Sequence, residues 1–489
     1  MRVTQALKWS FLSELAWRAV QPIVFIALAR LLVPDDFGVV AAATMVIAFS
    51  KVFWDAGMAK AVIQYPGDRA AAANVAFWVN LALGTCVAAA LVASADTIGL
   101  HVFHDQRVGP VLKVMSLQVL LAAAGSVHVA VLLRELKFRH LFYLQLSTVG
   151  IPGLISIPLA WHGEGYWALV LGSVMGQVAK LAILWRIADW KPALSFDRGI
   201  ATRLVRFGIW VAGAGLLGWL YHWADALLVG HSFSANALGL YHTGGMIGQI
   251  VYNICFGPIL PVLYSYLSKR QASGEFATAA VLLMQRTLLL VSLPVGLGLF
   301  VFGDSIAGLL GEKWVGAGPV IAILGLMHGL SWLMGANEEA YRAMGRPDIP
   351  TKILCAELLL YVPAYYVAAQ YSLTAFLWAR LGLTIVTMPV HFYALRHVMG
   401  LSYVRVLKNI APVALIAIAY LPVYVWAAGL AKEGSLWRLL LAGLVALMSV
   451  LLLSAPLVIW TARQFAALRG QPTSEAFDGS AVEKQFSPS

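Results

Sequence analysis

Three basic residues stand inside long apolar stretches of this sequence: Arg18, Lys51 and Lys180. Arg18 and Lys51 lie equally far along the chain on either side of a turn centred on Pro34–Asp35. At 1.5 Å per helical residue both would lie about 25 Å from that turn, and Lys180, counted from Glu164, would reach about the same depth. A charge in an apolar environment is costly and usually faces a cavity or a partner. Three cations at one level would bind an anion, and phosphate accepts charge-assisted hydrogen bonds from both Arg and Lys.

Two acidic residues provide a simpler explanation for the first two cations. Glu14 precedes Arg18 by four residues, and Asp55 follows Lys51 by four. Helical residues at this spacing are neighbours, so each pair could neutralise itself within its own helix. We therefore keep two interpretations: an anion-binding site with Glu14 and Asp55 as ion-coupling groups, or a structural charge network.

Composition indicates the environment in which such helices would lie. Of the 489 residues, 61% are hydrophobic and 12% are charged, whereas a soluble domain has about half and a quarter. So much apolar surface cannot be buried in one core, and the solvent must be the lipid bilayer. The net charge of +11 is scattered between apolar runs, which argues against nucleic-acid binding. The three cysteines lie in apolar stretches without the spacing of disulfides or metal sites.

Runs of about 20 apolar residues, the length that crosses a bilayer core, occur fourteen times. They are too long and too continuous for the strands of a membrane barrel. The expected fold class is therefore an all-α polytopic membrane protein with fourteen transmembrane helices. The expected helices cover residues 9–33, 37–63, 71–95, 108–132, 141–162, 164–188, 207–231, 236–262, 277–302, 316–341, 350–371, 373–395, 409–430 and 436–462.

The distribution of Lys and Arg predicts the orientation. One set of helix ends holds 23 basic residues and the other set holds 5. Because connecting segments rich in Lys and Arg stay in the cytoplasm, both termini should be cytoplasmic.

The sequence also contains an internal repeat. The pattern of apolar run, turn and apolar run recurs with an offset of 201 residues, which aligns Gly38 with Gly239. The basic segments "LLRELKFRHL" and "AYRAMGRPDI" recur after the fourth and tenth expected helices. Each repeat then holds six helices, and an even number restores chain direction, so the two lobes should be parallel about an axis along the membrane normal. We expect an N-terminal lobe over 1–190, a cytoplasmic linker over 191–206, a C-terminal lobe over 207–400, two additional helices over 401–465 and a disordered cytoplasmic tail over 466–489.

Aromatic and amide side chains take the place of the cations in the second lobe. Counted 201 residues on, Trp219 and Tyr252 correspond to the two cations of the first hairpin, with Trp223 and Asn253 close by. These four residues would suit sugar rings, although Trp and Tyr also mark lipid interfaces.

Other charged residues of the second lobe have competing roles. Asp225 could carry a coupling proton or cation, or pair with His222 or Arg380. Further acids near the helix ends, Glu338, Glu339 and Glu357, are expected to pair with Arg342 and Lys352.

Five segments resemble a known family: "LARLLVPDDFGVVA", "FWDAGMAKAVIQ", "LKFRHLFYLQL", "GEGYWALVLGSVMGQ" and "YRAMGRPDIPTK". They are similar to the Wzx-type polysaccharide-transport flippases of the multidrug/oligosaccharidyl-lipid/polysaccharide exporter superfamily. The resemblance covers about residues 1 to 400, and "FWDAG" departs from it where many relatives have Ser before the Asp.

The resemblance implies a bacterial inner-membrane protein that moves polyprenyl-pyrophosphate-linked oligosaccharide outward by alternating access, for surface or exopolysaccharide assembly. The anion held by Arg18, Lys51 and Lys180 would then be the pyrophosphate. Polysaccharide polymerase and export machinery are candidate partners.

Two other functions remain open. An ion-coupled multidrug exporter of the same superfamily should have an acidic cavity, whereas the first lobe has a surplus of bases. A membrane polysaccharide polymerase or ligase needs a long outward segment, but the longest, from Asp96 to Arg107, has about a dozen residues. The sequence contains no G-x-x-x-x-G-K-[ST], H-E-x-x-H or G-x-S-x-G motif, so no cofactor and no metal are expected.

Overall fold

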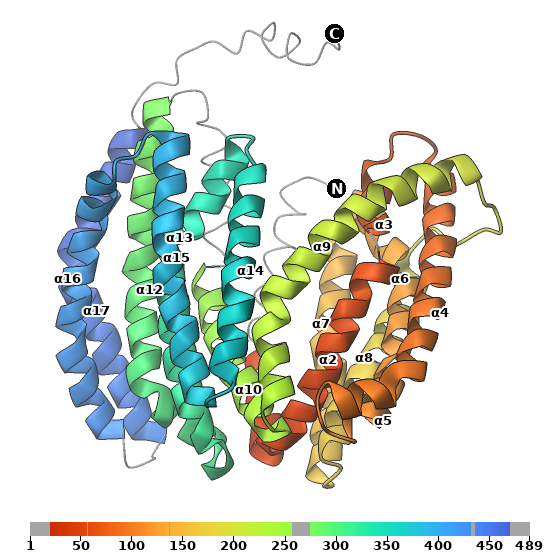
Figure 1. The fold of residues 1–489 in the computed structure, drawn as a ribbon, viewed down its shortest axis with the longest axis horizontal. Coiled ribbons are helices and arrows are strands. Elements are labelled where there is room, and N and C mark those ends of the chain that lie inside the picture. The colour runs from red at the N-terminus through yellow and green to blue at the C-terminus, as the bar shows by residue number, and fades with distance from the viewer. Residues whose placement is uncertain (1–19, 56, 136, 257–273, 432–435, 470–489) are drawn as a thin grey trace, which may run out of the picture.

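The computed structural model describes residues 20–55, 57–135, 137–256, 274–431 and 436–469. Every element in this part of the chain is a helix, as the apolar runs predict (Figure 1). The first repeat forms helix Val20–Leu31, α2 (Pro34–Trp54), α3 (Met58–Gln64), α4 (Arg69–His101), α5 (Val108–Met115), α6 (Leu117–Arg134), α7 (Phe138–Trp161) and α8 (Tyr166–Ile187). The rest forms α9 (Arg198–Ser232), α10 (Ala235–Phe256), α12 (Gly274–Leu310), η1 (Glu312–Ala317), α13 (Gly318–Ala343), α14 (Asp348–Ala369), α15 (Leu373–Met399), α16 (Tyr403–Ala431) and α17 (Leu436–Arg469).

Twelve helices of the described chain are long and apolar enough to cross a membrane, judged by length and composition. Two more of the expected runs fall on Val20–Leu31, which is shorter, and on α10. The polytopic all-α architecture is confirmed, and the count of fourteen stays a prediction.

Several boundaries differ from the expected ranges, and two of these differences have a clear local cause. The expected helix 37–63 is divided, because α2 ends at Trp54 and Gly57 has a φ of 68° before α3 begins. A side chain at Gly57 would also meet α9, since an added Cβ would lie 2.5 Å from Cβ of Val211. A glycine is therefore needed both for the left-handed backbone and for the close approach.

The second correction concerns the linker expected over 191–206. Only its first part is irregular, because α9 begins at Arg198, where the Asp197 carboxylate accepts a hydrogen bond from Ile200 N at 2.9 Å. This is an N-cap, which satisfies a free amide of the first turn. The first turns of α9 pack on the N-terminal lobe, where Leu204, 2% exposed, joins a cluster with Met58 and Phe77.

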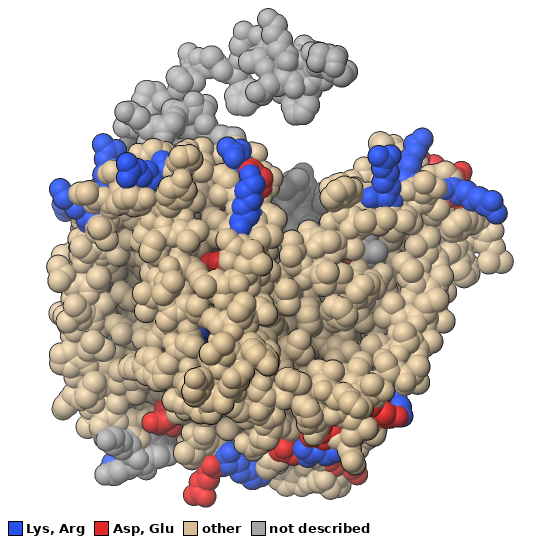
Figure 2. Space-filling view, in the orientation of Figure 1, with Lys and Arg blue, Asp and Glu red and all other residues tan. Residues whose placement is uncertain are grey.

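The two lobes meet at one end of the molecule and part at the other (Figures 1 and 2). We call the meeting end, where α2 and α10 begin, the closed end, and the other the open end. Residues of both lobes form one core towards the closed end, with Met45 and Phe103 from the first repeat and Leu238 and Tyr241 from the second. Lys and Arg gather at the open end, on both sides of a notch between the lobes (Figure 2).

The lobes touch backbone to backbone at the closed end. A Cβ added to Gly38 would lie 1.8 Å from the carbonyl oxygen of Ala235, and one added to Gly239 would lie 1.7 Å from that of Pro34. Residues 34 and 38 differ by the repeat offset of 201 from 235 and 239, so the two contacts are equivalent. Reciprocal contacts of this kind are the mark of a two-fold axis, here between the two lobes.

We expect Gly38→Ala and Gly239→Ala each to weaken the closed end by about 1–3 kcal/mol, the usual cost of overpacking. Spin labels at the exposed residues Gln106 and Asn236, one in each repeat, would report the change. In a chain whose three cysteines are replaced, pulsed electron paramagnetic resonance should show longer label distances in both variants. Gly213→Ala is the matched control, because nothing lies within 4 Å of its added methyl. Unchanged distances in the first two variants would show that the contact tolerates a side chain.

Candidate functional site

A cavity of about 400 Å³ lies inside the N-terminal lobe, between α2, α3, α6 and α8. Lys51 of α2 and Lys180 of α8 both line it. Arg18 and Glu14 lie outside the described residues. The polar groups lining the cavity besides the two lysines are Thr44, Asp55, Gln118, Ser126 and Gln177.

The two lysines have no ion pair within the described part of the chain. Lys51 is exposed to the cavity and Lys180 is half-buried, and their ammonium groups repel each other. Asp55 lines the same cavity, but its buried Oδ1 has no hydrogen-bond partner among the described residues. Lys51 and Asp55, four residues apart, thus do not form the hydrogen-bonded pair that would neutralise both charges within α2. Such an arrangement can accept an anion that bridges both ammonium groups.

A second cavity, of about 550 Å³, lies inside the C-terminal lobe between α9, α10, α13, α14 and α15. Trp223 lines it and stacks on His242, with ring centroids 6.2 Å apart and an interplanar angle of 15°. The polar and charged groups lining the cavity include His222, Asp225, Gln249, His328, Glu338, Glu357, Arg380 and His391.

Asp225 forms the centre of a buried polar group in this cavity. Its carboxylate, 4% exposed, pairs with Arg380 and accepts a hydrogen bond from the Tyr241 hydroxyl at 2.6 Å. The guanidinium also donates to the Tyr241 hydroxyl and lies over its ring, 5.7 Å from the centroid. Of the two partners considered for Asp225, the structure brings Arg380 to it. Its Oδ1 remains buried without a partner among the described atoms, so one oxygen is still able to accept a proton or a hydrogen bond.

Glu357 forms a second pair, with His391 of the neighbouring helix, so the expectation that it pairs with Arg342 or Lys352 is wrong. Nε2 of His391 lies 3.0 Å from Oε1 of Glu357, and both side chains are mostly buried. Arg380, Thr384 and His391 follow α15 at intervals that return to the same face of a helix, and all line the cavity. This periodicity was the signal in the sequence that could have placed His391 in the cavity. Glu338 does pair with Arg342, at 2.9 Å, as expected.

Only one of the four residues predicted to contact sugar lines either cavity, namely Trp223. Trp219 packs between the repeats instead, with Nε1 3.3 Å from the carbonyl oxygen of Met45. Tyr252 is a core residue, 2% exposed, and its hydroxyl donates to Gly325 O at 3.0 Å. Asn253 is exposed and accepts a hydrogen bond from Gln249 at 3.0 Å. The offset of 201 matched their positions along the helices but did not specify which way each side chain points.

We expect Arg380→Ala to lower the free energy of unfolding by about 3–5 kcal/mol, because it leaves Asp225 buried and uncompensated. The double variant Asp225→Leu/Arg380→Met should recover most of this loss, since both charges are then gone. Thermal unfolding in detergent measures the effect. Lys113→Ala, which removes an exposed pair with Asp96, should cost about 1 kcal/mol or less. If the double variant is as unstable as the single one, the pairing of charges is not the cause.

Relatives of known description match most of the chain. It is 25% identical over 424 residues to the teichuronic acid biosynthesis protein TuaB of Bacillus subtilis, over 86% of this chain and 87% of that protein. It is 24% identical over 424 residues to the lipopolysaccharide biosynthesis protein WzxC of Escherichia coli, over 81% and 83% of the two chains. The succinoglycan biosynthesis transport protein ExoT of Rhizobium meliloti is 23% identical over 329 residues, 67% of this chain and 66% of its own.

Solved structures share the two-lobed fold. The lipid II flippase MurJ, in an inward closed conformation, superposes with a TM-score of 0.70 over 93% of this chain and 100% of its own, at 13% identity. An inward-facing multidrug resistance MATE family transporter of the MOP superfamily gives 0.59 over 79% and 98%, at 14% identity. These likenesses establish the fold.

A sequence family described as polysaccharide biosynthesis protein matches residues 27–319, which is more than half of the chain. The resemblance drawn from the five sequence segments is thereby confirmed. The protein is a member of the polysaccharide biosynthesis protein family and has the fold of the solved MurJ and MATE family structures.

Proposed function

We propose that this protein is a flippase that moves polyprenyl-pyrophosphate-linked oligosaccharide from the cytoplasmic to the outer leaflet of the bacterial inner membrane. The observation that carries the proposal is a pair of lysines, Lys51 and Lys180, that line a cavity inside a lobe of apolar helices and have no ion pair with any residue that the structure describes. Keeping such charges in a membrane is costly, and a ligand that completes the pairing explains why they are there. The transport protein and flippase named among the relatives support the same function.

The two cavities suggest which part of such a substrate each lobe binds. The pyrophosphate is placed in the N-terminal cavity, between the ammonium groups of Lys51 and Lys180, and Arg18 is a third proposed ligand. The sugars are placed against the C-terminal cavity, where Trp223 offers an aromatic face and Gln249 an amide. The lipid tail stays in the bilayer, since only the polar head group needs shelter from it.

The proposed mechanism is alternating access between the two lobes. The open end admits the head group, and the lobes then part at the closed end to release it. The reciprocal contact of Gly38 and Gly239 suits this mechanism, because it brings the backbones of α2 and α10 together at equivalent positions of the two lobes. Asp225, whose Oδ1 has no partner among the described atoms, is the proposed ion-coupling group, while Asp55 and Glu14 are proposed to balance charge around the pyrophosphate.

Expression of the chain in a strain that lacks its own flippase tests the proposal. The expected result is that lipid-linked oligosaccharide accumulates on the cytoplasmic leaflet without the protein and is exported with it. A multidrug exporter of the same superfamily would instead raise resistance to cationic drugs and leave the glycan lipid where it was made. Polymerase and export machinery are proposed as partners that take up the product.

We expect the open end to face the cytoplasm, because Lys and Arg gather there (Figure 2), and the distribution of basic residues along the sequence predicts both termini on the cytoplasmic side as well. Single cysteines placed at Arg139 and Arg346 should resist an impermeant thiol reagent in intact cells, whereas one at the exposed Gln106 should react. Permeabilised cells serve as the control, since all three positions must then react. The reverse pattern in intact cells would invert the proposed direction of transport.

A further inference from the structure

The segment 102–107 between α4 and α5 joins the lobes at the closed end. His231, in the last turn of α9, approaches it with Nδ1 2.8 Å from the carbonyl oxygen of Val102. His104 approaches α9 in return, with Nδ1 3.2 Å from the carbonyl oxygen of His231. A carbonyl oxygen can only accept, so Nδ1 of each ring carries the hydrogen. The two imidazoles lie 5.0 Å apart between centroids.

An apolar contact also holds segment 102–107 against α9. Phe103 is 5% exposed and lies in the core shared by both repeats, with Val229 and Leu238. Gly230 makes room for it, since a Cβ there would lie 3.0 Å from the ring of Phe103. The segment is thus a piece of the N-terminal lobe that must leave α9 whenever the closed end opens.

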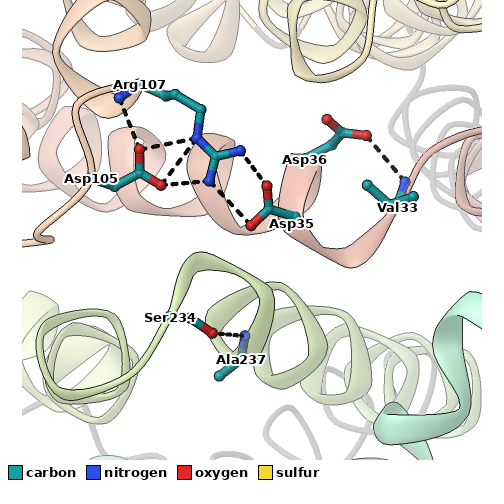
Figure 3. Close-up of polar contacts among 7 residues, drawn as sticks. All are labelled: Val33, Asp35, Asp36, Asp105, Arg107, Ser234 and Ala237. Carbon is teal, nitrogen blue, oxygen red and sulfur yellow. Dashed lines mark hydrogen bonds and ion pairs between the residues drawn. The ribbon is translucent and has the colours of Figure 1, made fainter.

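The other end of the segment is anchored to its own lobe. Arg107 binds the carboxylates of Asp105, with Nη2 to Oδ2 at 2.7 Å, and of Asp35 at the start of α2, with Nη2 to Oδ1 at 3.1 Å (Figure 3). Burial would raise the pKa of Asp105, but the hydrogen bonds and charge of Arg107 outweigh it and leave that pKa below its usual range. Hydrogen bonds to Asp105 and Asp35 raise the pKa of Arg107. Asp105 and Arg107 therefore keep their charges when the surroundings become acidic.

Carboxylates on the neighbouring elements are already engaged. Asp36 of α2 accepts a hydrogen bond from Val33 N at 3.1 Å (Figure 3), and Asp96 of α4 pairs with Lys113 of α5 at 2.6 Å. His101, at the end of α4, contacts the carbonyl oxygen of Thr97. The first turns of α10, residues 235–241, carry no charged side chain. A proton gained by His104 or His231 would therefore face the other imidazole across the contact.

We propose that segment 102–107 is an acid-released latch of the closed end, with His104 and His231 as its proton-sensing pair. Both rings already use Nδ1 as a donor, so a further proton goes to Nε2 and leaves two imidazolium ions at the present contact distance. Imidazole is the side chain that gains charge nearest to neutral pH. Their repulsion favours separation of the lobes, so acid on the outer side promotes opening and substrate release. The inference rests on the alternating access proposed above, and concerns its regulation.

The spin-label pair at Gln106 and Asn236 tests the latch in the purified full chain without any substrate. Between about pH 8 and pH 5, the interval in which histidine gains its charge, the ratio of open to closed protein should rise about tenfold. The variant His104→Asn/His231→Asn should stay closed at both values, because asparagine can donate from the same side but cannot take the charge. His101→Asn, a histidine outside the contact, should keep the full response.

Two results would overturn the latch: no response to acid in the unaltered pair, or a full response in the double asparagine variant. If the double variant is open at both pH values, the single variant His104→Asn tests the latch in its place, because it retains the hydrogen bond from His231 to Val102. It must lose most of the response, because one charge alone has no partner to repel. A chain with an intact latch that moves no glycan lipid would count against the proposed substrate and not against the latch.

Discussion

Lys180→Ala should lower the transport of lipid-linked oligosaccharide about 10- to 100-fold, because a hydrogen bond to a charged group contributes about 1.5–3 kcal/mol. The protein should still reach the membrane folded, since Lys180 has no ion pair to lose within the described chain. Lys51→Ala should have the same effect for the same reason. The rate at which a fluorescent polyprenyl-pyrophosphate glycan crosses the bilayer of proteoliposomes measures both.

The charge dependence separates pyrophosphate binding from packing. Lys180→Glu should be worse than Lys180→Ala, because it repels the phosphates that the ammonium attracts. Arg18→Ala is expected to fail likewise, and Arg18→Lys to be impaired but milder, since the planar fork of the guanidinium is lost while the charge stays. Lys113→Ala is the matched control: a basic residue at the closed end, paired with Asp96, whose loss should leave transport unchanged.

Two outcomes would contradict this site. If the alanine variants unfold, and neutralising Glu14 or Asp55 as well restores them, the charges form a structural network. If transport survives each of the three alanine changes, the pyrophosphate binds at other residues.

Crosslinking the closed end should stop transport almost completely. The first turns of α2 and α10 lie in contact, with Pro34 O against Gly239 and Ala235 O against Gly38. A cysteine within residues 34–36 and another within 234–236, joined by a short cleavable reagent, would hold the lobes together there. The head group could then enter from the open end but could not leave, so at most one turnover is possible. Flipping in proteoliposomes before and after crosslinking gives the result.

Cleavage of the reagent should restore the rate, which excludes damage by the cysteines themselves. A crosslink within one lobe, between cysteines at the exposed residues Thr97 and Gln106, is the control and should leave transport active. Normal flipping by the protein joined across the two lobes would rule out their separation at the closed end as part of the mechanism.

The architecture could be predicted because it depends on the length of the apolar runs and on the internal repeat, which are both visible in the sequence. Each apolar run has the length of a bilayer core, and the offset of 201 residues aligned Gly38 with Gly239. The reciprocal contact of these two glycines in the folded protein has the same offset. The boundaries were harder, because Gly57 breaks a continuous apolar run and Asp197 starts a helix inside what composition alone presents as a polar linker.

For the candidate site, the sequence predicted the position of each residue along its helix but not the direction of its side chain. Depth along a helix follows from the residue number, and depth placed Lys51 and Lys180 at one level, where they line one cavity. The same arithmetic suggested Tyr252 as its counterpart in the second lobe, but that side chain turns into the core and donates to Gly325 O.

The sequence by itself determined that this protein is helical, lies in a membrane, has two related lobes and holds charges within them, since each of these depends on length, polarity and repetition. Only the tertiary structure decided which side chains share a cavity, that Asp225 pairs with Arg380 and Glu357 with His391, and that the histidines at positions 104 and 231 meet across the lobes. The physical reason is that the rotation of each helix about its axis is set by packing against its neighbours, and in an apolar helix nearly every face is equally suited to burial.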